Sequence, residues 1–215
     1  MRETFHAKLD TLIGDLASTA RLAGQMMTNA AIALHHADLE LAESVISGKG
    51  RLKTLCEDMD QRCVMLLVLQ APVATDLRMV VAAMHAVGDL QRMSDLAQHI
   101  AKIARMKYRT GPIPDEVRPV FARMSVLATS LAQDAARAIE IRDPMSAHRL
   151  AQDDDEVDAL RRRTFQILFS EDWSHGVEPA VDAALIGRYY ERFADHAVAI
   201  ARQVSFLATG LPPQR

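Results

Sequence analysis

The chain has 215 residues, of which 49% are hydrophobic and 25% charged, the balance of a globular protein with room for one substantial domain or two small ones. A formal net charge of −3 and the lack of a long basic run argue against a nucleic-acid-binding surface, which needs concentrated lysine and arginine. Aromatic residues make up only 5% while alanine is abundant, which favours closely packed helices over a β-sandwich.

The first part of the chain shows helical periodicity. Apolar residues recur at steps of three and four over 4–34, which predicts one long helix. Asp38 is the predicted N-cap of a second helix that runs to about Gln70. We expect the Ser-Gly-Lys-Gly stretch at 47–50 to bend or fray this helix, since an interior glycine costs about 1 kcal/mol relative to alanine.

A third helix opens at Thr75 or Asp76 and carries the same periodicity. The segment 109–114, rich in turn-forming glycine and proline, is the strongest linker signal in the chain. The helical pattern then restarts over about 115–141. The chain so far is therefore expected to contain three helices, a linker and a fourth helix.

Two more helices complete the second half. Asp143 is the predicted N-cap of a helix with Pro144 at its first position and an end near Ser170. A last helix is expected over about 179–208. No segment alternates with period two for long enough to predict a strand, so the fold class is all-α.

A short phrase occurs twice. Residues 91–101 read QRMSDLAQHIA and residues 191–201 read ERFADHAVAIA, with five of eleven positions identical. Self-similarity at a fixed spacing predicts two supersecondary units that share a core. The predicted boundaries are a first three-helix unit over 1–108, a linker over 109–114 and a second three-helix unit over 115–215.

The cysteines and the apolar runs indicate the cellular compartment of the protein. Cys56 and Cys63 lie seven residues apart on one face of a predicted helix, a spacing that disfavours a disulfide, so both are expected to be reduced packing residues. The start of the chain lacks the apolar stretch of a signal peptide, and the longest apolar run, 63–69, is far short of the roughly 20 residues that span a bilayer. These features predict a cytoplasmic protein without a membrane span.

Two pairs of carboxylates mark the second half. Asp154 and Asp158, and again Glu191 and Asp195, are spaced i and i+4, so each pair projects from one helical face. Antiparallel packing within a three-helix unit would bring the pairs together, and converging like charges need a cation between them. Oxygen ligands of this kind suit Mg²⁺, Mn²⁺, Ca²⁺ or iron.

Ordinary ion pairs are the alternative. Arg188 precedes Glu191 by three residues, Arg192 precedes Asp195 by three, and Arg162 follows Asp158 by four, so each could neutralise an acid within its helix. From spacing alone, ion-paired helix faces and a metal site both stay open.

The first half departs from this acidic pattern. Aligning 48–55 with 153–160 places Lys49 opposite Asp154 and Lys53 opposite Asp158, and Gln91 stands opposite Glu191. Asp89 and Asp95 remain, so the first half carries at most a degenerate site. Any metal is therefore expected in the second half.

Sequence motifs for catalysis are missing. No Glu-x-x-His pair appears, which argues against a ferritin-like di-iron oxidase, and the sequence has no Walker loop, dinucleotide-binding turn or nucleophile elbow. No catalytic residue is predicted.

Two stretches resemble the signature of the PhoU family. They are LQAPVATDLRMVVAAMHAVGDLQRMSDLAQHIAKIA at 69–104 and YYERFADHAVAIAR at 189–202, and the similarity covers essentially the whole chain. The resemblance implies two three-helix bundles packed side by side in a homodimer. It also implies metal clusters on Glu/Asp-x-x-x-Asp motifs, here Glu191 and Asp195 with Asp154 and Asp158.

The same resemblance implies a role. Proteins of this family are cytoplasmic negative regulators of phosphate uptake and phosphate-starvation signalling, and their partners are the ATPase of the phosphate ABC transporter and a sensor histidine kinase. Arg78, Arg92 and Arg192 are candidate partner contacts. The alternatives are a metal-dependent phosphohydrolase that uses the carboxylates of the second half and a helical scaffold without a ligand.

Overall fold

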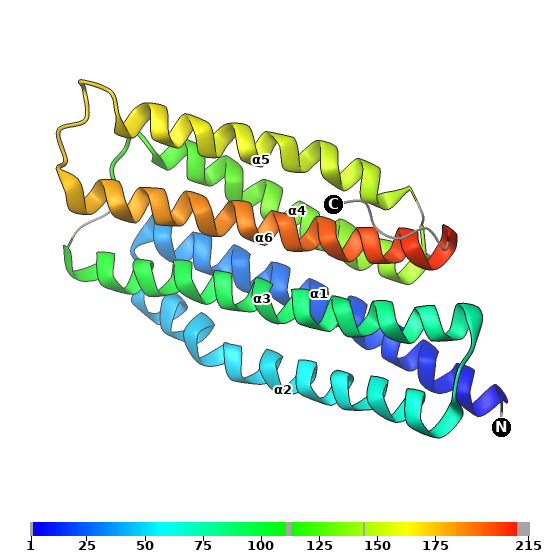
Figure 1. The fold of residues 1–215 in the computed structure, drawn as a ribbon. Helices are drawn as coiled ribbons and strands as arrows, with labels where there is room; N and C mark the ends of the chain where they lie inside the picture. The colour runs from blue at the N-terminus through cyan, green and yellow to red at the C-terminus, as the bar shows by residue number, and fades with distance from the viewer. Residues whose placement is uncertain (1, 111–112, 144, 210–215) are drawn as a thin grey trace.

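The computed structural model describes residues 2–110, 113–143 and 145–209, and within these ranges it contains helices and no strands. The helices are α1 (Arg2–His36), α2 (Leu39–Gln70), α3 (Ala74–Thr110), α4 (Arg118–Ile141), α5 (Ser146–Leu168) and α6 (Val177–Thr209) (Figure 1). The all-α prediction is confirmed.

Four helices form the middle of the molecule. Helix α1 packs against α3 and α4, and α6 packs against the same two helices, so the four close a ring. Helix α2 lies on α1 and α3, whereas α5 lies on α4 and α6, and Figure 1 shows these two helices on opposite sides of the ring. Each repeat, α1–α3 or α4–α6, thus contributes two helices to the ring and one flanking helix.

One hydrophobic core runs through both repeats. Its largest fully buried side chains include Leu9 and Met27 of α1 together with Phe121, Tyr190 and Phe193 from the second repeat. Amphipathic helices are stabilised by burying an apolar face, and here the buried faces of the two repeats meet in the same cluster.

Small residues allow α1 and α4 to approach closely. A Cβ atom added to Gly24 would lie 3.0 Å from the Cβ of Ala132, closer than an ordinary contact, so the two helices would have to shift slightly apart to admit a side chain at this crossing. The hydroxyls of Thr28 and Thr129 bond across the same contact at 2.9 Å. The alanine-rich composition therefore serves helix packing.

Polar contacts join α3 to α6 in antiparallel order. Lys107 pairs with Asp182 at 2.6 Å and both side chains are largely buried. Toward the other end, the ring of His99 stacks on that of Tyr189, with centroids 5.0 Å apart, and His196 Nδ1 lies 2.9 Å from Asp89. Side chains thus tie the two repeats together along this contact.

Helix α2 is continuous where we expected a bend. The stretch 47–50 is helical, and Asp38 caps the helix by accepting a hydrogen bond of 2.9 Å from the Leu41 amide. Val45 and Leu52 on either side are buried, and this burial offsets the low helix propensity of the intervening glycines.

The second repeat begins its first two helices later than predicted. Helix α4 starts at Arg118 because the residues from 115 to 117 form a turn. Helix α5 starts at Ser146, since the Asp143 carboxylate accepts a hydrogen bond from the Met145 amide at 2.9 Å and so caps the turn before the helix. Pro144, like residues 111–112 of the predicted linker, lies outside the described residues.

The other boundaries agree with the prediction to within two residues. Helix α3 begins at Ala74 in place of Thr75 or Asp76, and α5 ends at Leu168 in place of Ser170. Helix α6 begins at Val177, two residues before the predicted start. None of the helices, over the described ranges, carries an apolar stretch long enough to cross a bilayer.

Candidate functional site

The carboxylates of the second repeat meet where α5 packs on α6. The Asp154 side chain on α5 is half-buried, and burial raises its pKa to about 7, with further contributions from the negative charges of Asp195 and Asp158. Arg202 opposes this effect. The structure therefore brings acids of the two helices into electrostatic contact.

The pKa of Asp195 is raised for the same reasons as that of Asp154. Burial is the largest cause of its raised pKa, followed by the charges of Glu191 and Asp158, while Arg188 and His196 oppose the rise. Ionised carboxylates in such surroundings are destabilised unless a cation compensates them.

One oxygen of this cluster has no partner. The Asp154 Oδ1 atom is buried and accepts no hydrogen bond from any described residue. A buried polar atom without a partner costs free energy, and a cation bound at this oxygen would offset that cost.

Glu191 is neutralised by arginines. Its side chain is only 11% exposed and lies between Arg161, whose Nε is 3.3 Å from the carboxylate, and Arg188, which makes a short ion pair from the same helix. The guanidinium of Arg161 also lies over the Phe165 ring, 5.5 Å from its centroid. The expected Arg188 pair is thus present, but the arginine that reaches the acids from α5 is Arg161 and not Arg162.

The cluster meets only part of what a metal requires. The negative charges of Asp154, Asp158 and Asp195 act on one another across the two helices, and their oxygens are the ligands that hard cations prefer. However, Glu191 is held by its arginines, and within the described ranges no three histidine, cysteine or acidic side chains are arranged to hold a metal ion. The four-residue metal centre stays a prediction.

Repeat one carries a cation at the matching position. Lys49 Nζ lies 2.6 Å from the Asp95 carboxylate, and Arg92 lies 3.6 Å from it. Lys49 and Asp95 correspond to Asp154 and Asp195 in the alignment of the repeats. The same contact is therefore an ion pair in one repeat and a pair of like charges in the other.

The two acids of the degenerate first site point to different helices. Asp95 pairs with Lys49 on α2, whereas Asp89 contacts His196 on α6. The structure does not bring Asp89 and Asp95 together at one site.

The candidate partner arginines differ in exposure. The side chain of Arg92 is 70% exposed, and Arg192 is also exposed on α6. Arg78 is only partly exposed, and its Nη2 donates to the Thr75 hydroxyl at 3.0 Å. Arg92 and Arg192 are therefore accessible to a partner.

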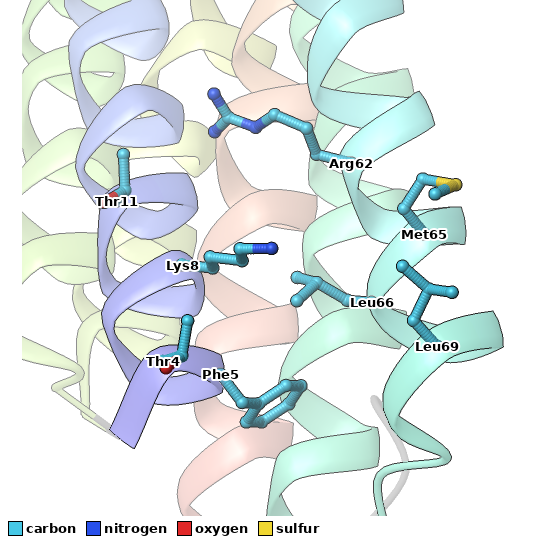
Figure 2. A pocket seen from close by; sticks show the side chains of 8 residues that line it. All are labelled: Thr4, Phe5, Lys8, Thr11, Arg62, Met65, Leu66 and Leu69. Atoms are coloured by element: carbon cyan, nitrogen blue, oxygen red, sulfur yellow. The ribbon is translucent and has the colours of Figure 1, made fainter. Parts of the chain in front are cut away.

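Sequence reasoning missed an apolar groove between α1 and α2. It has a volume of about 280 Å³, and Figure 2 shows Phe5 and Lys8 of α1 reaching toward Leu66 and Arg62 of α2. The apolar run at 63–69 could have indicated this groove. A helix buries only one face, so a continuous run of seven apolar residues leaves some of them exposed.

Comparisons with known proteins agree over the whole chain. The model of the PhoU domain matches residues 16–104 and 121–204, one match in each repeat. The chain is 44% identical over 213 residues to the phosphate-specific transport system accessory protein PhoU homolog 2 of Mycobacterium tuberculosis, a match that covers 99% of this chain and 100% of that protein. Homolog 1 of Mycobacterium leprae is 42% identical, with 100% of this chain and 96% of that protein covered.

Solved structures share the fold. The crystal structure of PhoU from Pseudomonas aeruginosa superposes with a TM-score of 0.90 and 26% sequence identity, covering 96% of this chain and 100% of that one. The phosphate transport system regulatory protein PhoU from Streptococcus pneumoniae has the same fold, with a TM-score of 0.88. The chain belongs to the PhoU family.

Proposed function

We propose that this protein is a cytoplasmic accessory protein of phosphate-specific transport that holds phosphate uptake and phosphate-starvation signalling off when phosphate is plentiful. The supporting observation is the similarity over nearly the full chain, in both repeats, to relatives named as accessory proteins of that transport system. Its partners are the ATPase of the phosphate ABC transporter and a sensor histidine kinase, and it acts as a homodimer.

In this proposal the protein acts by contact and catalyses no reaction. Burial raises the pKa of the Cys56 and Cys63 thiols to about 11, so neither is a ready nucleophile at neutral pH. The exposed Arg92 and Arg192, one in each copy of the repeated phrase, are the residues through which a partner would be contacted.

A metal ion in repeat two is part of the proposal. Asp154, Asp158 and Asp195 would hold a divalent cation or iron, which would offset the repulsion between these carboxylates. Glu191 would join them only after leaving Arg161 and Arg188.

Deletion of the gene tests the regulatory role. In phosphate-rich medium we expect a reporter of phosphate-starvation genes to rise in the deletion strain and to return to its basal level when the gene is restored. Where the genome holds a second family member, the double deletion is used because one copy can replace the other. Unchanged reporter expression in that strain would contradict the proposal.

A phosphohydrolase is the competing function. The pKa of Asp154 near 7 suits a general acid or base, which is the observation that favours it. This function predicts phosphoester turnover that requires a divalent ion and disappears in Asp195→Ala. Lack of turnover with any divalent ion would leave the regulatory function as the better account.

A further inference from the structure

A second cleft lies along the groove between α1 and α4, and none of the four acids of α5 and α6 is among its lining residues. It has a volume of about 850 Å³. One end is lined by His35 and His36 from the last turn of α1 and by Arg118 from the first turn of α4. The described residues that line the cleft include no aspartate or glutamate.

Two nitrogen atoms at this end lack hydrogen-bond partners. His35 Nε2 and Arg118 Nε are both buried, and neither bonds to any group in the described part of the chain. The Nη2 atom of Arg118 is engaged, because it donates to the Ile113 carbonyl at 3.2 Å and pairs with the exposed Asp115 at 2.9 Å. These contacts anchor the guanidinium while leaving its Nε–H without an acceptor.

The end of α4 adds positive potential. Val117 at its N-cap makes no side-chain capping bond within the described residues, and α4 is 24 residues long. The N-terminal end of a helix attracts anions through its free backbone N–H groups and its dipole. Arg118 and Pro119, the first two residues of the helix, both line the cleft, and Pro119 has no N–H, so the donors at this end are the other free backbone N–H groups of the first turn.

A structural role explains only part of this arrangement. Histidines in the last turn of α1 interact favourably with the carbonyl end of that helix. However, burial lowers the pKa of His35, and the charges of His36 and Arg118 lower it further, so the three groups repel one another when charged. Helix capping does not account for Arg118 beside them or for the unpartnered nitrogens.

We propose that this end of the α1–α4 cleft binds a phosphate-like oxyanion, held by His35, His36, Arg118 and the N-terminus of α4. Arginine and helix N-termini recognise such anions through charge-assisted hydrogen bonds. The remaining cleft, lined by residues such as Ile32 and Val126, has room for the organic part of a phosphorylated molecule. The site goes beyond the proposed regulatory function, and its failure would leave that function standing.

Titration of the folded protein tests the site. Histidine ring resonances in ¹⁵N-labelled protein are followed while inorganic phosphate, sulfate or ATP is added at constant ionic strength, with sodium chloride as the reference salt. We expect a saturable shift of the His35 signals. Arg118→Gln should weaken binding about tenfold or more, and Arg118→Lys should retain part of the affinity.

Arg123 provides the matched control. It lies on the same helix but pairs with Glu156 in a bidentate contact on the surface, so Arg123→Gln should leave the affinity unchanged. Circular dichroism checks that each variant is folded. If Arg118→Gln fails to fold, His35→Gln replaces it, with the same expected loss of affinity measured by calorimetry.

Each outcome has one meaning. Saturable binding of inorganic phosphate identifies the free anion as the ligand, whereas binding of ATP alone identifies the phosphoryl group of a larger molecule, and both support the site. A shift that does not saturate and is reproduced by sodium chloride would overturn it. Equal loss of affinity in the Arg118 and Arg123 variants would overturn it as well.

Discussion

At Asp154, burial and the neighbouring negative charges both disfavour the ionised carboxylate. Its pKa is raised from an ordinary 3.8 to about 7, first by burial and then by Asp195 and Asp158. Between about pH 4 and pH 7 the unfolded chain has lost this proton while the folded chain retains it. Because the folded state then binds more protons, the contribution of this group to the free energy of unfolding falls as pH rises through that interval and is constant above it.

Asp154→Asn removes this penalty. In metal-free protein we expect the variant to be more stable than the parent by about 1–2 kcal/mol at pH 7.5, a value reduced for partial solvent screening, and nearly equal to it at pH 4. Urea unfolding in the presence of a chelator measures both. The exposed Asp153→Asn is the control and should behave as the parent. A destabilised Asp154→Asn protein at pH 7.5 would contradict the prediction.

Lys49, which occupies the position of Asp154 in repeat one, stabilises the ionised carboxylate of Asp95. Its ion pair with Asp95 is partly buried, so Lys49→Ala should lower the free energy of unfolding by about 1 kcal/mol. Lys53→Ala on the same helix removes only an exposed pair with Glu57 and should change stability little. Denaturant unfolding of the two variants compares them directly, and equal stabilities would show that the Lys49 pair contributes nothing.

At the scale of the elements, apolar periodicity predicted which segments form helices, whereas the starts of α4 and α5 lie two to three residues from the prediction. Periodicity predicts a helix because burial of one face stabilises it, and this held even across the glycines at 47–50. The first residue of a helix depends on which carbonyl and carboxylate oxygens accept hydrogen bonds from the backbone amides at its start. Asp143 therefore capped a turn at Met145 and not the helix itself.

The contact between α3 and α6 depends on a largely buried ion pair. Lys107→Ala would leave Asp182 buried without its cation, so we expect a loss of about 3 kcal/mol in the free energy of unfolding. Thermal unfolding by calorimetry measures the loss. Arg105→Ala, which removes an exposed pair with Glu43, is the control and should unfold close to the parent. A mild Lys107→Ala phenotype would mean that this ion pair contributes little to the contact between α3 and α6.

At the scale of the molecule, the two repeats share a fold and differ in charge. Both copies of the repeated phrase keep the apolar and alanine positions that pack into the common core. The aspartate of each copy, however, faces a lysine in repeat one and an aspartate in repeat two. A duplicated architecture thus holds two different electrostatic environments.

This asymmetry predicts metal in repeat two alone. Elemental analysis of the purified protein after incubation with divalent ions or iron should show bound metal that is lost when Glu191→Gln is combined with Asp195→Asn. Asp95→Asn, at the corresponding position of repeat one, should retain it. Metal retained by the double variant would refute the assignment to these residues.

Much of the fold was predictable from sequence, and less of the site. Repetition and periodicity predicted six helices in two units, because both report on residues that must be buried regardless of their exact partners. The acids of α5 and α6 were identified by spacing, and their convergence followed from antiparallel packing. The pairing of Glu191 with Arg161 could not be predicted, since it depends on the rotation of α5 about its axis.

The sequence by itself determined the helices, the repeat and the unequal distribution of charge, since these depend on residue type and spacing along one chain. Only the tertiary structure decided which charges meet. It placed Lys49 against Asp95 and Lys107 against Asp182. It also placed His35 and His36 of α1 in the same cleft as Arg118 at the start of α4. Such contacts join residues far apart in sequence, and their energies depend on burial and on distances that arise only when the helices pack.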